Sequence, residues 1–414
     1  MEDHRSRVAP LEALPPIVLS PGFQSYPWGD PAFIPKLFGL PVTGQPYAEA
    51  WFGAHPSLPS LADLGGRKVT LDHALAESGA AILGPQLAGL PFLFKVLAAA
   101  YPLSVQVHPS AAQAISGFNR ENAAGIALQA ANRNYRDTNA KPELFVALTR
   151  FQALCGFRPV DEIATALAGA PELAALMPEW QQASNPLRSL LGAYFDLSDE
   201  VLRPALAGWV GRLTEAHPLP ETAEAWILAA DRIFSAGGQP DRGLFFFLLL
   251  NLVTIEPGQG LFLSPGTPHA YLRGAGIEVM ASSDNVLRAG LTAKHVDPQE
   301  LLSILRCKSQ PPHILRPGSG DSTTYLTATA AFELHRTKVG AAATPERLAC
   351  GPELLFFLGD TPAASIELES SPSPITLPSA GCCLVPHGTR YRTRATGTGS
   401  LLRVSVPAPE PRHP

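Results

Sequence analysis

The segment LVTIEPGQGLFLSPGTPHAYL, residues 252–272, consists of short apolar runs separated by Pro-Gly turns. This alternation is typical of β-strands joined by tight turns. The same pattern precedes it in residues 11–158, for example in LPFLFKVL and PELFVALT, and returns after it up to about Val406. The sequence therefore predicts a mainly β protein.

A different periodicity interrupts the β pattern between residues 159 and 250. The stretches DEIATALAGAPELAALM, SDEVLRPALAGWVGRLTEAH and ETAEAWILAADRIFSAGG carry apolar residues at i, i+3, i+4 and i+7, and each begins with Asp, Ser or Glu. This spacing predicts amphipathic helices. We expect a first β domain formed by residues 1–158 plus 251–310, a helical domain at 159–250, and a C-terminal β domain at 311–414.

Composition and charge exclude several classes of protein. The 414 residues are 46% hydrophobic and 16% charged, with a net charge of −5, so cores can form but a basic nucleic-acid-binding face is not expected. No apolar stretch approaches the ~18–20 residues of a membrane helix, and the N-terminus lacks a signal region. The five cysteines form no CxxC pair, which is typical of a reduced, cytoplasmic protein.

Four residues in three β-like segments could bind a metal ion. Gln106 and His108 are spaced i, i+2 in PLSVQVHP, so both point to one face of a strand. Glu143 begins the apolar strand ELFVAL, and His269 follows a Pro-Gly turn. Histidine and carboxylate are ordinary zinc ligands, and an amide oxygen would add a neutral one. The alternative is that each of these side chains lies in water at a half-exposed strand or loop.

A further charged segment, IEVMASSDNVLRAGLTAKH, contains Glu278, Asp284, Arg288 and Lys294 among small residues. Paired opposite charges with space between them suit a sugar or a phosphate. The alternative is a solvated loop with surface ion pairs. Three of only seven lysines lie in or beside the segments considered so far: Lys95, Lys141 and Lys294. Their concentration there favours the phosphate interpretation.

Six motifs occur in an order that resembles the type I phosphomannose isomerase family. They are YPWGD, AWFGAHPSLPS, LPFLFKVL with PLSVQVHP, NYRDTNAKPEL with CGFRP, PGTPHAYL, and SSDNVLRAGLT. The match runs from about Gln24 to about Leu301 and is weaker beyond. The resemblance implies a cupin (jelly-roll) catalytic domain, a helical domain and a second, cupin-like C-terminal β domain.

The resemblance also assigns roles to individual residues. It places one zinc ion per chain on Gln106, His108, Glu143 and His269, and it makes Arg288 the essential catalytic arginine. Other matching positions are expected to bind substrate: Lys141, Glu278 and Asp284 along the pocket, and Ser104, Lys95 and Lys294 toward the phosphate. Ala50 and Val279 depart from the family pattern without removing a charged or ligating group.

The implied activity is interconversion of mannose 6-phosphate and fructose 6-phosphate, feeding mannose and GDP-mannose metabolism. A proton would move between C1 and C2 through an enediol(ate), and the base remains open among Glu278, Lys141, Asp284 and a zinc-bound hydroxide. The alternatives are a cupin dioxygenase with iron on His108, Glu143 and His269, and a non-catalytic sugar-binding cupin. The expected partner is a small sugar phosphate, with neither nucleic acid nor membrane. The oligomeric state stays open, a monomer included.

Overall fold

The computed structural model describes residues 14–370 and 374–407. The start of the expected first β domain and the end of the expected C-terminal β domain therefore lie outside the described residues. The described chain forms two compact units. The first contains the residues up to Phe23, Trp51–Phe94 and those from Gly318 onward, and the second contains Gln24–Ala50 and Lys95–Pro317. The chain passes from one unit to the other in β2 (Gly22–Gln24), in β3 (Glu49–Phe52), in β6 (Phe92–Ala99) and between Pro317 and Gly318. The expected three-domain division stays a prediction.

The first unit is an antiparallel β-sandwich. One sheet has the order β15-β16-β23-β18-β21-β1-β4-β5, and the other has the order β17-β22-β19-β20. Their inner faces bury a shared core that includes Leu355 and Phe357 from the larger sheet and Ile366 and Leu377 from the smaller one. The elements are β1 (Ile17–Ser20), β4 (Leu61–Leu64), β5 (Arg67–Thr70), α2 (Leu71–Leu83), β15 (Ser322–Tyr325), β16 (Glu333–Val339), β17 (Arg347–Leu348), β18 (Glu353–Gly359), β19 (Ser365–Ser370), β20 (Ile375–Pro378), β21 (Cys382–Val385), β22 (Arg390–Ala395) and β23 (Gly399–Ser405).

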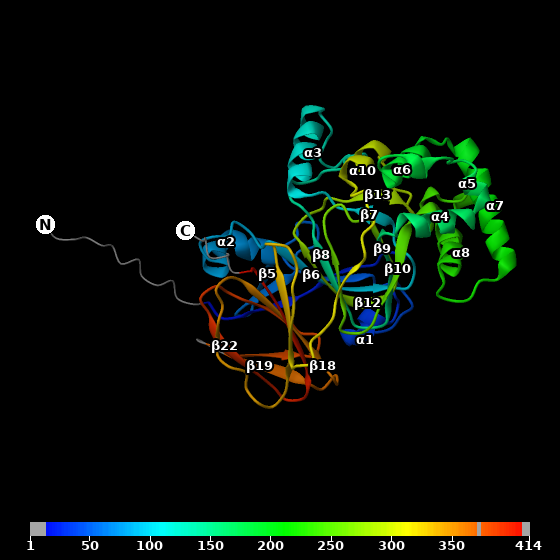
Figure 1. Ribbon diagram of the computed structural model, residues 1–414. Helices are drawn as coiled ribbons and strands as arrows, with labels where there is room; N and C mark the ends of the chain where they lie inside the picture. The colour runs from blue at the N-terminus through cyan, green and yellow to red at the C-terminus, as the bar shows by residue number, and fades with distance from the viewer. Residues whose placement is uncertain (1–13, 371–373, 408–414) are drawn as a thin grey trace. The chain divides into compact units, whose positions relative to one another are not determined.

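The second unit combines antiparallel strands with most of the helices (Figure 1). Its strands are β7 (Val105–Val107), β8 (Glu143–Ala147), β9 (Phe151–Phe157), β10 (Leu250–Ile255), β11 (Gly260–Leu263), β12 (His269–Ala281), β13 (Leu287–Gly290) and β14 (His313–Leu315). Its helices are α1 (Phe33–Leu37), α3 (Ala111–Ala123), α4 (Val160–Ala168), α5 (Pro171–Ala174), η1 (Trp180–Gln182), α6 (Pro186–Asp196), α7 (Asp199–Ala216), α8 (Ala223–Phe234), η2 (Ala236–Gly238), η3 (Arg242–Phe245), α9 (Phe246–Leu249) and α10 (Pro298–Ile304). The prediction of a mainly β chain with a helical insertion is therefore confirmed.

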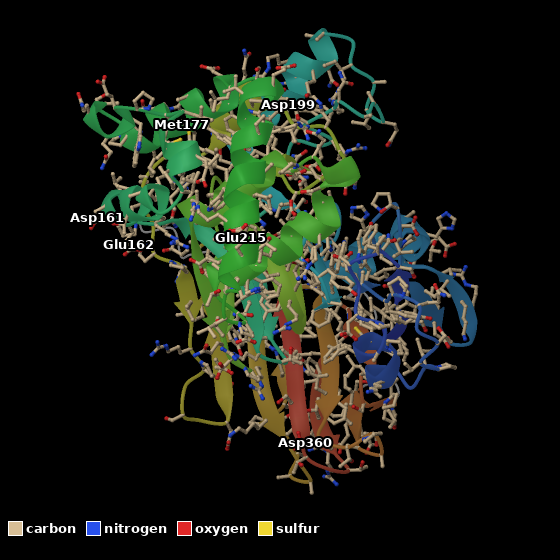
Figure 2. The ribbon with its side chains drawn as sticks, turned by 90° about the vertical axis from the view of Figure 1, so that its right-hand side faces the viewer. Asp161, Glu162, Met177, Asp199, Glu215 and Asp360 are labelled. Atoms are coloured by element: carbon tan, nitrogen blue, oxygen red, sulfur yellow. The ribbon has the colours of Figure 1, made fainter. Side chains whose placement is uncertain are left out.

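The helices α4 to α9 are inserted between two paired strands. β9 and β10 are antiparallel, and Phe157 at the end of β9 pairs with Leu250 at the start of β10. Acidic residues in the first turns of α4 and α7, labelled in Figure 2, offset the positive end of each helix dipole: Asp161, Glu162 and Asp199. Within the described ranges, every helix is too short or too polar to span a lipid bilayer.

A bend in β12 connects two groups of strands. Its first residues pair with β7 and β9, the register shifts between Tyr271 and Arg273, and its later residues pair with β8. A bulge of this kind changes the direction of a strand and increases its twist. One strand therefore carries both His269 and Glu278 to the region where β7 and β8 place their own polar residues.

Candidate metal centre

The pairing of β7 with its two neighbours brings three predicted site residues together. Gln106 on β7 pairs with His269 on β12 and with Arg288 on β13. Directly paired residues on antiparallel strands project to the same face of the sheet. Gln106, His269 and Arg288 therefore share one face, although 182 residues separate the first from the last in the sequence.

The opposite face of these strands is apolar. Val105 and Val107 on β7 and Leu287 and Ala289 on β13 join the large hydrophobic core that also contains the helices α4 to α8. The strand alternation explains this division, because successive side chains point to opposite faces. The core of the helical insertion thus packs behind the strands that carry the polar residues.

Two histidines lie on either side of one carboxylate. His108 Nε2 is 3.2 Å from Glu143 Oε1, and His269 Nε2 is 3.5 Å from Glu143 Oε2. All three side chains are buried, and their candidate ligand atoms lie within 4.8 Å of one another. Within residues 14–370 and 374–407, these three side chains form the group of His, Cys, Asp or Glu residues that could hold a metal ion. The alternative of water-exposed side chains is thereby excluded for these three residues.

The hydrogen bonds of the histidines fit metal binding. His108 Nδ1 lies 2.9 Å from the carbonyl oxygen of Asn285, and His269 Nδ1 lies 3.1 Å from that of Thr267. A carbonyl oxygen accepts a hydrogen bond from Nδ1–H, which leaves the Nε2 lone pair free as a ligand. His108 Nε2 is buried and faces Glu143 Oε1 at 3.2 Å, but it forms no hydrogen bond to this or any other described residue. A buried polar atom of this kind needs a partner, and a metal ion would supply one.

The ionisation states also fit. Burial alone would raise the pKa of Glu143, but His108 and Lys141 hold it well below its ordinary range. Burial and the neighbouring His108 lower the pKa of His269 to about 4. At neutral pH the site thus offers a carboxylate and a neutral imidazole, which are the forms that bind metal.

Gln106 and Lys141 complete the surroundings of the triad. The amide nitrogen of Gln106 donates to Ser104 Oγ over 3.2 Å, and its oxygen has no hydrogen bond within the described part of the chain. Lys141 Nζ lies 3.3 Å from Glu143 Oε1 and is buried. Gln106 is therefore placed to add a neutral oxygen to the donor set, and its role as a ligand stays a prediction.

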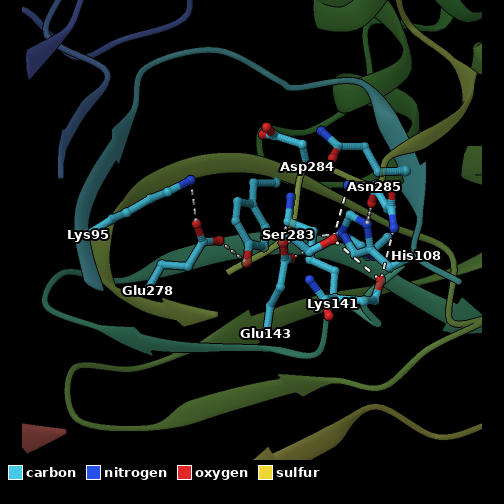
Figure 3. Close-up of polar contacts among 12 residues, drawn as sticks. Lys95, His108, Lys141, Glu143, Glu278, Ser283, Asp284 and Asn285 are labelled. Carbon is cyan, nitrogen blue, oxygen red and sulfur yellow. Dashed lines mark hydrogen bonds and ion pairs between the residues drawn. The ribbon is translucent and has the colours of Figure 1, made fainter. Parts of the chain in front are cut away.

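Lys95 lies in an acidic environment. Its ammonium is 3.4 Å from Glu49 Oε1 and 3.4 Å from Glu278 Oε2, and all three side chains are buried. Figure 3 shows the contact with Glu278. Burial alone would lower the pKa of Lys95, but the carboxylates of Glu49, Glu278 and Glu143 raise it. Two adjacent carboxylates leave no net positive charge for a phosphate. The phosphate role stays a prediction that this arrangement does not favour.

Glu278 is held between Lys95 and Tyr271. The Tyr271 hydroxyl donates to Glu278 Oε1 over 2.9 Å. Burial raises the pKa of Glu278 to about 7; Lys95 opposes this shift, and Glu143 and Glu49 add to it. A carboxyl group with this pKa can exchange a proton near neutral pH.

A second group of charges is cationic. Burial and the neighbouring Arg136 lower the pKa of Arg288, and burial together with Arg288 and Arg136 lowers the pKa of Lys294. None of these three side chains forms an ion pair with a carboxylate in the described residues. Mutually repelling cations without a carboxylate are a suitable place for an anion. Asp284, by contrast, has an exposed side chain, and its backbone N–H donates to Asp137 Oδ2 over 2.8 Å.

Asn285 connects the two loops that flank the site. Its Nδ2 donates to the carbonyl oxygens of Asp137 and Asn139, each over 2.9 Å, and its Oδ1 accepts from the backbone N–H of Arg136 over 2.8 Å. Its own carbonyl is the one beside His108 Nδ1. The buried Asn285 therefore fixes both the loop that carries Arg136 and the orientation of a candidate ligand.

Sequence reasoning missed four residues of this region: Glu49, Arg136, Tyr271 and Asn285. Glu49 had a readable signal, because a carboxylate in the strand EAWF needs a cation. Arg136 and Asn285 lie inside motifs that were already quoted, but nothing in their spacing shows which side chain they meet.

Comparisons with known proteins give one consistent match. A family model described as phosphomannose isomerase type I, catalytic domain, matches residues 17–160. Mannose-6-phosphate isomerase of Salmonella typhimurium is 41% identical over 296 residues, which is 70% of this chain and 74% of that protein. The human mannose-6-phosphate isomerase is 31% identical over 394 residues, covering 86% of this chain and 90% of its own.

Solved structures give the same result. A mannose 6-phosphate isomerase bound with zinc and yttrium superposes with a TM-score of 0.83 at 33% identity, covering 95% of this chain and 100% of that one. The Salmonella typhimurium enzyme bound to its substrate, fructose 6-phosphate, and to zinc also gives a TM-score of 0.83 at 33% identity, with the same coverage.

Proposed function

The chain belongs to the type I phosphomannose isomerase family, and we propose that it interconverts mannose 6-phosphate and fructose 6-phosphate as a zinc-dependent isomerase. The observation that carries this proposal is the buried triad of His108, Glu143 and His269. The chain has the cupin-type fold of the zinc-bound isomerases with which it superposes.

The metal ligands proposed here are His108, Glu143, His269 and Gln106, with one zinc ion per chain. When bound there, zinc supplies a Lewis acid that polarises oxygen atoms of the sugar. The buried carboxylate balances the charge of the ion, and the carbonyls at Asn285 and Thr267 keep both Nε2 atoms available. Lys141 further holds Glu143 in its ionised form.

Arg288 is proposed to stabilise the charge that develops on the substrate. Moving a proton between C1 and C2 creates an enediolate with negative charge on oxygen. Arg288 shares a face with Gln106 and His269, and no carboxylate in the described residues competes for its guanidinium. A preorganised donor of this kind lowers the barrier because it needs no rearrangement during the reaction.

Glu278 is the proposed proton-transfer group. Its pKa of about 7 matches what a general base needs near neutral pH. Lys95 and Tyr271 fix its two oxygens and stabilise the ionised form. Lys141 is less suited because its ammonium is engaged with Glu143, and Asp284 because its side chain is exposed.

For the phosphate of the substrate we propose Arg136 and Lys294, with Ser104 as a hydroxyl partner. Arginine and lysine without an opposing carboxylate attract a phosphomonoester. A cytoplasmic location and a role in mannose and GDP-mannose metabolism are proposed with the activity. The oligomeric state is left open.

A coupled assay with metal analysis tests the proposal. Purified protein should hold about one zinc per chain, and fructose 6-phosphate formation from mannose 6-phosphate should stop after chelation and return with zinc. His269→Ala should lose zinc and turnover together, because a missing ligand weakens the site. Iron in place of zinc together with oxygen consumption would instead indicate the dioxygenase. Sugar binding without turnover would indicate a non-catalytic cupin.

A further inference from the structure

At one end of the β-sandwich of the first unit, the inner face carries polar residues. On β23, Leu401 lies in the apolar core and Arg403 lies two residues later, so both point to the inner face. Cross-strand pairing adds Thr337, opposite Leu401, and His335, opposite Arg403. The inner face of a sandwich is ordinarily apolar, so charged residues there need an explanation.

The smaller sheet contributes polar residues to the same face. Tyr391 and Thr393 on β22 are buried, whereas Arg390, Arg392 and Arg394 alternate with them and are exposed. Arg347 on β17 pairs with Tyr391 and therefore shares its face, at the open rim of the sandwich. Together with Arg403 of the larger sheet, the inner face thus carries two arginines, a tyrosine and a threonine. The outer face of β22, which is labelled in Figure 1, carries three arginines.

Glu353 anchors this group. Its side chain is 2% exposed, and it accepts from Arg347 Nε and Nη2 at 2.9 and 2.7 Å and from the Tyr391 hydroxyl at 2.5 Å. Arg403 Nη1 lies 3.5 Å from the same carboxylate. Two guanidinium groups therefore share one buried carboxylate, which cannot pair fully with both of them.

Donors remain unused in this group. Arg403 Nη1 also donates to Ser405 Oγ over 3.1 Å, but its Nε and Nη2, and Nη1 of Arg347, have no partner among the described residues. Burial lowers the pKa of Arg403; Glu353 opposes this shift and Arg347 adds to it. The nearby His335 lies 3.3 Å from Glu333, and burial lowers the pKa of this imidazole. An added anion would relieve the repulsion between the two arginines.

Arg347 and Arg403 line a cavity of about 470 Å³. Its polar walls come from Arg347, Arg403, Tyr391 and the threonines Thr337, Thr344 and Thr393, while Glu346 is exposed to solvent. The volume lies in the range of small-molecule sites, about 300–1,000 Å³. A purely structural role explains the cavity poorly, because apolar residues of similar volume would close the sandwich at less cost than buried ions.

We propose that this cavity in the C-terminal β-sandwich binds the phosphate oxyanion of a small metabolite, at a site separate from the isomerase centre. Arg347 and Arg403 would contact the oxyanion, and the threonine hydroxyls would hydrogen-bond to it or to attached hydroxyl groups. The geometry fits this ligand because planar guanidinium forks and hydroxyl donors are the usual partners of phosphate.

Titration calorimetry on the zinc-loaded full chain tests the proposal, with inorganic phosphate and glucose 6-phosphate as probes. Arg403→Gln should weaken binding of at least one probe by tenfold or more, since it removes charge-assisted hydrogen bonds. Arg392→Gln is the matched control, because Arg392 lies on the outer face of β22 and pairs with Glu369. Any phosphate that binds at the isomerase centre adds the same heat in every variant, so this heat cancels when the variants are compared.

A milder variant keeps the test valid if Arg403→Gln does not fold. The Thr337 hydroxyl has one protein partner among the described residues, Ser322 Oγ at 3.3 Å, so Thr337→Val leaves the Glu353 network intact. Loss of one hydrogen bond of ~1 kcal/mol should weaken binding about fivefold. Isomerase activity should be unchanged in every variant. Tighter binding of glucose 6-phosphate than of phosphate would identify a sugar phosphate as the ligand, and the reverse would identify free phosphate. Wild-type isotherms in folded Arg403→Gln and in Thr337→Val would overturn the proposal.

Discussion

Arg288 and Lys95 are both cations near the metal centre, but their surroundings assign them different roles. Lys95 is neutralised by Glu49 and Glu278, whereas Arg288 shares its strand face with Gln106 and His269 and has no carboxylate partner in the described residues. A cation that is already paired contributes to the buried network, while an unpaired one is available to the substrate. An exposed arginine on the protein surface neither belongs to a buried network nor lies beside the substrate.

Arg288→Ala should lower turnover by a factor on the order of 10²–10³ and change the Michaelis constant much less. The reason is that the charge it meets forms only during the reaction, and interactions confined to the transition state appear in turnover. Zinc content should stay at the wild-type value. Arg273→Ala is the control, because Arg273 lies on β12 in an exposed pair with Glu221. A change in the Michaelis constant alone would move Arg288 to the phosphate end.

Glu278 should give the isomerase an acid limb in its pH profile. If the ionised carboxylate is the base, kcat/KM falls tenfold per pH unit below its pKa, which is about 7 without metal and lower beside a bound cation. The Tyr271 hydroxyl donates to this carboxylate and so stabilises the ionised form. Tyr271→Phe should therefore raise the pKa of Glu278 and move the acid limb to higher pH.

Profiles of kcat/KM between pH 5.5 and 9 for the wild type and for Tyr271→Phe measure this shift in the acid limb. Glu278→Gln should lose most turnover while keeping zinc, since Glu278 is not a proposed ligand. An acid limb that stays at the same pH in Tyr271→Phe would assign it to another group.

At the scale of elements, strand alternation could be predicted and strand pairing could not. The period change after Pro159 correctly located helices, whereas the expectation that Gln106 and His108 share one strand face stays a prediction, because β7 ends at Val107. The bulge that turns β12 from β7 and β9 toward β8 has no signal in the sequence. Register between distant strands is set by tertiary packing, so the placement of Lys95 between two carboxylates could not be read from spacing.

The loop before β13 is expected to control metal affinity through Asn285. Asn285→Ala removes the side chain that fixes residues 136–139, and the backbone carbonyl beside His108 is then held less firmly. Loss of a partner that orients a ligand commonly costs 10–100-fold in metal affinity. Zinc affinity, measured by competition with a chelator, should fall by about that factor.

Asn134→Ala is the matched control for this loop. Among the residues that the structure describes, its side chain makes one hydrogen bond, to Asp297 Oδ2 at 3.0 Å. Both variants should lose some thermal stability, but only Asn285→Ala should lose zinc affinity. Equal zinc affinity in the two variants would show that Asn285 has a structural role alone.

At the scale of the whole molecule, the metal centre joins parts of the chain that are far apart in sequence. The proposed ligands span residues 106 to 269, and the helices from α4 to α9 are inserted between them at the paired ends of β9 and β10. An insertion at this place leaves the strand register unchanged, because Phe157 and Leu250 are already neighbours. Zinc would therefore cross-link β7, β8 and β12 around an insertion whose core lies on the other side of β7 and β12.

Removing the metal should destabilise the fold by a predictable amount. An ion that binds only the native state adds RT ln(1 + [L]/Kd), which is about 2.7 kcal/mol when free zinc is a hundred times Kd. Chelation should therefore lower the melting temperature by several degrees in scanning calorimetry, and added zinc should restore it. His108→Ala should melt at a temperature that depends much less on zinc or chelator, because loss of one of the four proposed ligands weakens the site. Arg392→Gln should keep the full response, since it changes charge on the outer face of β22. An equal response to chelation in His108→Ala and the wild type would place the stabilising metal somewhere other than this triad.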